Sequence, residues 1–202
     1  MKKIMDEGVA HPQVCFLGIG DQYSDSAPIQ VGQFEASDEL LDKWLKTIWL
    51  ESGGGGSMEE SYQLAWWFAA HHTSVDHILK RNKKGILITI GDEKCHKSLS
   101  KDEIKRFFGN GSEKDIPTSE ILNMARENWD VYHINLRDWS GNKKAVQDYW
   151  KQLIGDHLIN TENGTGDDIA DIISGIILKS AGTGWTKQES PKIEEKQTEH
   201  LR

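Results

Sequence analysis

The hydrophobic positions of the chain form short apolar runs that alternate with stretches of helical spacing. The apolar runs predict strands at residues 13–19, 29–36, 86–90, 131–136 and 157–161. Apolar residues three and four apart predict helices at residues 37–49, 58–79, 100–108, 118–128, 146–153 and 169–179. Because strands alternate with helices, the pattern favours an α/β fold with a doubly wound, mostly parallel sheet over a helical bundle or a β-sandwich.

The run Ile86 to Ile90 (ILITI) is the clearest of the predicted strands, and it ends at Gly91-Asp92-Glu93. An apolar strand without polar alternation is typical of a parallel sheet covered on both faces. Three polar loops, at residues 20–28, 53–61 and 91–97, follow predicted strands or open a helix, and the carboxyl ends of parallel strands meet at one edge. Oxygen ligands suited to Mg²⁺ or Mn²⁺ come from these loops: Asp21, Asp25, Ser57, Ser61, Asp92 and Glu93. The competing interpretation is that each of these residues caps a helix or solvates a turn.

Composition limits the domain organisation and the partners. The chain has 202 residues, enough for one domain, and residues 183–202 are charged and nearly free of apolar side chains. We therefore expect one domain over residues 1–182 and a disordered charged tail over residues 183–202. A formal charge of −8 disfavours nucleic acid and anionic membranes as partners. Two cysteines, no apolar signal sequence and no apolar run of membrane-spanning length predict a cytoplasmic protein outside the membrane.

Two motifs that contain histidine could be catalytic or metal-binding, but each also has a purely structural interpretation. Cys95-His96 could supply a thiol nucleophile, but adjacent residues rarely face each other and no nucleophile motif surrounds them. His72 and Asp76 are one helical turn apart and could bind a transition metal, although the glutamate of a zinc-peptidase helix is missing. We expect both motifs to serve the structure rather than catalysis.

Several stretches resemble the bacterial von Willebrand factor A-type (vWA) domains, over residues 1–182. They are FLGIGD (16–21), SDSAP (24–28), IQVGQFEA (29–36), IWLESGGGG (48–56), EESYQLAWWFAA (59–70) and KKGILITIGDE (83–93). The resemblance implies a Rossmann-like fold with a metal-ion-dependent adhesion site at the strand-end edge. It matches Asp92 to the aspartate that holds the metal through water, and Ser57, with Ser61 as a second candidate, to the segment that supplies a threonine ligand.

The chain departs from the family at the first strand, which ends in an Asp-x-Ser-x-Ser motif there. Ser24 and Ser26 have the serine spacing here, but Gln22 stands where the aspartate belongs and Asp21 is one position off. The resemblance therefore implies an N-terminally incomplete domain, either truncated by a late start or a degenerate relative that pairs with a partner. The strands at 13–19 and 86–90 would then lack a neighbour. We expect them to pair directly, or the chain to self-associate or bind a partner there.

Two functions follow as expectations. The first is a cytoplasmic, adaptor-like interaction module with an incomplete metal site that binds Mg²⁺ or Mn²⁺ weakly or not at all in the isolated chain. Its partner would be another protein, for which the resemblance implies an AAA-type ATPase, or a second copy. The alternative is a metal-dependent hydrolase in which Asp21, Asp92 and Glu93 surround a cation and its bound water. The sequence favours the first, because no general base or nucleophile stands out.

Overall fold

The computed structural model describes residues 1–51, 59–109, 111–136, 143–161 and 164–182, without the side chain of His77. It confirms a mixed α/β fold with a parallel sheet flanked by helices. Ser57, the glycine run before it and the tail at 183–202 lie outside the described residues, so the predictions made for them stay predictions.

The main sheet has three parallel strands, in the order β4-β8-β9. These are β4 (Gly85–Gly91), β8 (Trp129–Asn135) and β9 (Leu158–Asn160). Leu87 lies opposite Val131, and Ile134 lies opposite Ile159. The predicted strands at 86–90, 131–136 and 157–161 are confirmed, with ends that move by one or two residues.

Short pairs of strands make up the rest of the described β-structure. Antiparallel pairs join β1 (Leu17–Ile19) to β2 (Ile29–Val31) and β6 (Ser98–Leu99) to β7 (Ile116–Pro117), while β3 (Glu59–Glu60) is parallel to β5 (Lys94–Cys95). The expected strand at 13–19 is therefore shorter than predicted, preceded by an isolated bridge from Val14 to Glu35. Direct pairing of this strand with 86–90 is wrong, because β1 pairs with β2 and β4 pairs with β8.

The described helices are α1 (Lys2–Asp6), α2 (Asp38–Thr47), α3 (Tyr62–His71), α4 (Asp76–Arg81), α5 (Lys101–Phe108), α6 (Thr118–Asn128), α7 (Lys143–Ile154) and α8 (Gly166–Ala181), with a 3₁₀ turn, η1 (Gly155–His157). The prediction of one helix over 58–79 is wrong. Its first residues form β3, because they find a parallel partner in β5. The helix ends at His71, and Thr73, whose hydroxyl donates to the carbonyl of Ala69 (2.7 Å), belongs to the turn before α4.

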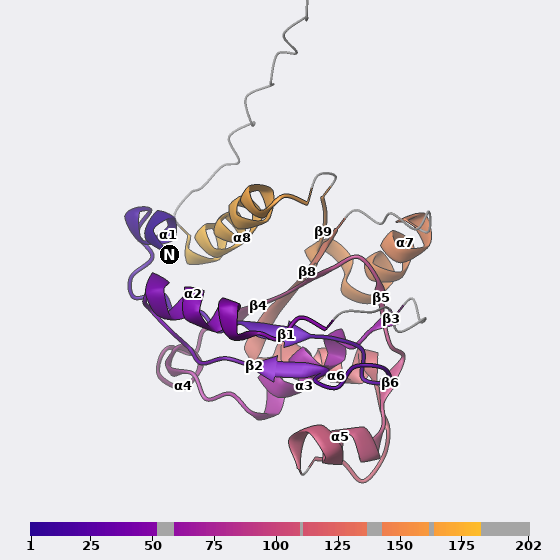
Figure 1. The fold of residues 1–202 in the computed structure, drawn as a ribbon. Coiled ribbons are helices and arrows are strands. Elements are labelled where there is room, and N and C mark those ends of the chain that lie inside the picture. The colour runs from indigo at the N-terminus through magenta and orange to yellow at the C-terminus, as the bar shows by residue number, and fades with distance from the viewer. Residues whose placement is uncertain (52–58, 110, 137–142, 162–163, 183–202) are drawn as a thin grey trace, which may run out of the picture.

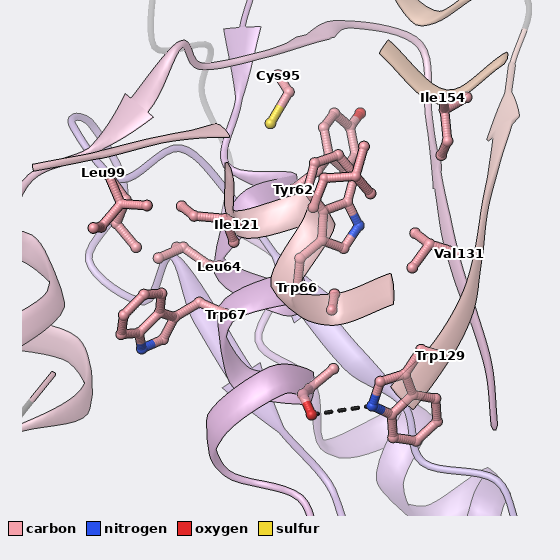
Figure 2. Close-up of a cluster of buried hydrophobic side chains, with 14 of the residues drawn as sticks. Tyr62, Leu64, Trp66, Trp67, Cys95, Leu99, Ile121, Trp129, Val131 and Ile154 are labelled. Atoms are coloured by element: carbon pink, nitrogen blue, oxygen red, sulfur yellow. Dashed lines mark hydrogen bonds between the residues drawn. The ribbon is translucent and has the colours of Figure 1, made fainter. Parts of the chain in front are cut away.

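The core surrounds α3, which is buried on nearly all sides. Figure 2 shows Tyr62, Leu64, Trp66 and Trp67 of this helix packed among apolar side chains from other elements, and the indole N–H of Trp129 donates to the carbonyl of Ala69 (3.0 Å). In Figure 1, α3 and α6 lie on one side of strands β4 and β8, and α8 lies on the other. Among the described helices, none has the length and apolar character needed to cross a bilayer.

Candidate functional site

Asp21 follows the end of β1 and is 4% exposed. Its Oδ1 accepts from the backbone N–H of Tyr23 (3.1 Å) and faces Nε2 of His96 (2.9 Å), and its Oδ2 accepts from the hydroxyl of Ser24 (3.0 Å). Burial alone would raise the pKa of Asp21, but these hydrogen bonds and the nearby imidazole outweigh it and lower the pKa. Asp21 is therefore a carboxylate whose two oxygens are both used within the protein.

His96 joins Asp21 to β3. Its Nε2 lies 2.9 Å from Oδ1 of Asp21, its Nδ1 lies 3.2 Å from Oε2 of Glu59, and the ring of Tyr23 packs edge-on against it with 4.8 Å between centroids. The His96 side chain is 5% exposed. An imidazole that carries both ring protons can donate to both carboxylates at once. The contact between His96 and Asp21 therefore holds the β1–β2 loop against the segment that connects β5 to β6.

Ser61, at the N-terminal end of α3, is fully buried and takes part in a second polar connection. Its hydroxyl accepts from the backbone N–H of Gln22 (2.8 Å), and its own N–H donates to the carbonyl of Gly20 (3.3 Å). Gln22 and Gln63 are joined through their side-chain amides (2.8 Å). The Ser61 hydroxyl thus positions the loop after β1 and is not directed at solvent.

Glu60 lies among the carboxylates that follow β1 and β4. Burial, together with the negative charges of Glu93, Asp21, Asp25 and Asp92, raises the pKa of Glu60 to about 7. Its Oε2 is buried and has no hydrogen-bond partner among the described residues. The structure therefore brings together the predicted carboxylates of two polar loops, as expected for the carboxyl ends of strands. We call these five residues the carboxylate cluster.

The donors in the described residues do not fit a Mg²⁺ or Mn²⁺ site. Within the described ranges, no group of three or more His, Cys, Asp or Glu side chains is arranged to hold a metal ion. Asp25, like Asp21 and Ser61, is already engaged in hydrogen bonds within the protein, because its Oδ2 accepts from the N–H of Asp21 (2.7 Å). Asp92 is exposed, and Ser57 lies outside the described residues. Among the described residues the cluster is therefore a concentration of negative charge.

The polar residues beneath the cluster belong to the core. Gly91 has no room for a side chain, since a Cβ there would overlap the hydroxyl of Tyr62. His133 stacks on Trp150 (3.5 Å between centroids), its Nδ1 lies 2.9 Å from the hydroxyl of Thr89, and burial lowers its pKa to about 3. An uncharged imidazole that is closed off from solvent in this way supports packing and has no route to a substrate.

The two histidine motifs play the structural roles expected of them. Cys95 is fully buried, its thiol donates to the side-chain carbonyl of Gln63 (2.9 Å), and burial raises its pKa, so it is not a nucleophile. His72 stacks on Phe108 (5.1 Å between centroids), while Asp76 pairs with Lys80 (2.7 Å). The predicted proximity of His72 and Asp76 therefore gives no metal site.

Sequence reasoning missed Glu59, Glu60 and the carboxylate partners of His96. The two glutamates read as the acidic first turn of a helix, and the His96–Asp21 contact joins residues 75 positions apart. Their signal, two adjacent acids after a glycine-rich loop, does not distinguish a helix start from a strand end.

The chain matches no protein-family model, and no curated protein or solved structure resembles it significantly.

Proposed function

We propose that the chain is a cytoplasmic, adaptor-like protein-interaction module of vWA type with a degenerate metal site, and that it binds its partner through the outer edge of β4. The observation that carries this proposal is the free hydrogen-bonding edge of that strand. In the described part of the chain, β4 pairs with β8 alone and has no strand on its other side.

The direction of the free backbone groups follows from one hydrogen bond. The carbonyl of Gly91 accepts from the N–H of Leu136 (2.8 Å), just past the end of β8. Backbone groups of successive residues in a parallel strand point alternately to its two sides. The N–H and C=O groups of Ile86, Ile88 and Ile90 therefore point away from β8, and no hydrogen bond joins them to other described residues.

The described strand β4 carries in its own sequence none of the residues that keep exposed edges from pairing. Natural edge strands carry lysine, proline, a bulge or an inward-pointing charge. The strand here reads GILITIG, Ile90 is 38% exposed, and Ile86 and Ile88 are half-buried. An extended segment from another polypeptide can pair with such an edge, with main-chain hydrogen bonds that supply affinity.

Other features support the proposal. The resemblance to vWA domains implies a strand beside residues 86–90 and, as one class of partner, an AAA-type ATPase. Both cysteines are free thiols, as expected in a reducing compartment. Weak or absent binding of Mg²⁺ or Mn²⁺, the degenerate form of the adhesion site, is part of the proposal.

Amide hydrogen exchange tests the proposal directly. In the free protein we expect fast exchange at Ile86, Ile88 and Ile90, and slow exchange at Leu87 and Thr89, whose N–H groups face β8. Addition of an extended peptide of alternating valine and threonine should slow the three isoleucine amides and leave the other two unchanged. The proposal fails if such peptides, presented at millimolar concentration, never protect these amides.

One observation favours a second function, the metal-dependent hydrolase. A glutamate with a pKa of about 7 at a polar edge has the acidity of a general acid or base. Turnover of bis-(p-nitrophenyl) phosphate with Mg²⁺ or Mn²⁺, abolished in Asp92→Asn, would establish the hydrolase. Absence of turnover at all pH values between 5 and 9 would dismiss it.

A further inference from the structure

We infer that the segment which pairs with β4 runs parallel to it, is acidic before its apolar stretch and is basic immediately after it. This inference rests on the proposed interaction function and adds the chemistry and direction of the partner. It follows from the charges at the two ends of the free edge.

The carboxyl end of the edge is negative. Asp92 and Glu93 follow β4 directly, and both contribute to the raised pKa of Glu60, as do Asp21 and Asp25. Lys94 is the nearest positive residue along the chain and lies in β5, opposite Glu59. Asp92 is exposed at this end of the strand, and a cationic side chain placed beside it would be attracted to its carboxylate.

The amino end of the edge is positive. Lys83 and Lys84 come immediately before β4, and Arg81 lies in the last turn of α4; all three are exposed, while the neighbouring Lys80 pairs with Asp76 (2.7 Å). The ammonium of Lys84 donates to the carbonyl of Arg126 (2.6 Å), which leaves its charge without a carboxylate partner in that contact. The edge is thus a short apolar strand between a basic and an acidic end.

The direction follows from the sheet. Both described pairs of neighbouring strands in this sheet, β4 with β8 and β8 with β9, are parallel. A segment that continues the parallel ladder brings its own carboxyl end to the carboxylate cluster and its amino end to Lys83 and Lys84. Complementary charges at both ends then require an acid–apolar–base order along the partner.

Two peptides of identical composition test this order with the full chain. The first is Glu-Glu-(Val-Thr)₃-Val-Lys-Lys, and the second is Lys-Lys-(Val-Thr)₃-Val-Glu-Glu, each with a fluorophore and blocked termini. Since solvent-exposed charge pairs each contribute modestly, we expect the first to bind about three- to tenfold more tightly at low salt. About 0.5 M NaCl should remove most of the difference.

Charge-reversal variants locate the effect. Asp92→Lys should remove most of the preference for the first peptide. Asp102→Lys, an equal change at an exposed position of α5, should preserve it. Equal binding of the two peptides, or tighter binding of the second, overturns the inference and leaves the interaction function standing. If neither peptide binds, the proposed function itself fails.

Discussion

Glu60 provides the sharpest quantitative prediction, through the variant Glu60→Gln. Burial and the charges of Glu93, Asp21, Asp25 and Asp92 raise its pKa from 4.5 to about 7. At about 1.4 kcal/mol per pKa unit, the shift corresponds to at most about 3.5 kcal/mol of destabilisation by the ionised carboxylate. Solvent screening at this partly buried position reduces the figure, so we expect about 1 to 2 kcal/mol.

The sign of the effect depends on pH. Between pH 4.5 and 7 the folded protein retains a proton on Glu60 that the unfolded chain has lost, so the native state loses stability as the pH rises through this window. The glutamine variant keeps a neutral side chain of the same shape at every pH. Its free energy of unfolding should match that of the wild type near pH 4.5 and exceed it by about 1 to 2 kcal/mol at pH 8.

Urea unfolding at pH 4.5, 6 and 8 measures this difference. The matched control is Glu59→Gln, one residue earlier, where the carboxylate accepts from His96 (3.2 Å) and its loss should give no stabilisation at pH 8. An equal gain for Glu60→Gln at all three pH values, or no gain at pH 8, would contradict the raised pKa of Glu60.

Three further predictions concern the core beneath the cluster. The imidazole resonances of His133, whose pKa lies near 3, should show no protonation shift in NMR spectra between pH 8 and pH 5, and a midpoint near 6.5 would contradict its burial. Gly91→Ala should lower the free energy of unfolding by more than about 1 kcal/mol, because the new methyl group displaces a tyrosine hydroxyl, while Gly166→Ala, in open space, should be neutral or stabilising. Leu64→Ala, at a fully buried position, should cost about 3 kcal/mol in urea unfolding, whereas Leu50→Ala, at an 84% exposed position, should stay within about 0.5 kcal/mol.

Local signals explain which elements could be predicted from the sequence. The helix predicted at 118–128 coincides with α6, and the strand predicted at 86–90 lies within β4. Both have unbroken patterns with clear boundaries, a proline before the helix and glycines around the strand. Ser100 likewise marks the start of α5, where it forms a capping box with Glu103.

The elements that could not be predicted depend on partners distant in the sequence. Glu59 and Glu60 have the composition of a helix start, but they pair with Lys94 and Cys95 and become a strand. The alternation of strands and helices predicted that the three polar loops meet at one edge, but the position of His96 between two acids depends on the folded arrangement. Periodicity reports which face is apolar, and it carries no information on which polar side chains meet.

The apolar character of α3 on all sides has a consequence for biosynthesis. Trp66 packs on Trp150 of α7, and the carbonyl of Ala69 accepts from Trp129 of β8, so two elements that cover this helix are translated about 60 to 85 residues after it. Until they leave the ribosome, the faces of this tryptophan-rich helix that they cover stay exposed. Nascent chains paused before residue 129 should therefore be held by chaperones that bind apolar segments, and released ones should aggregate.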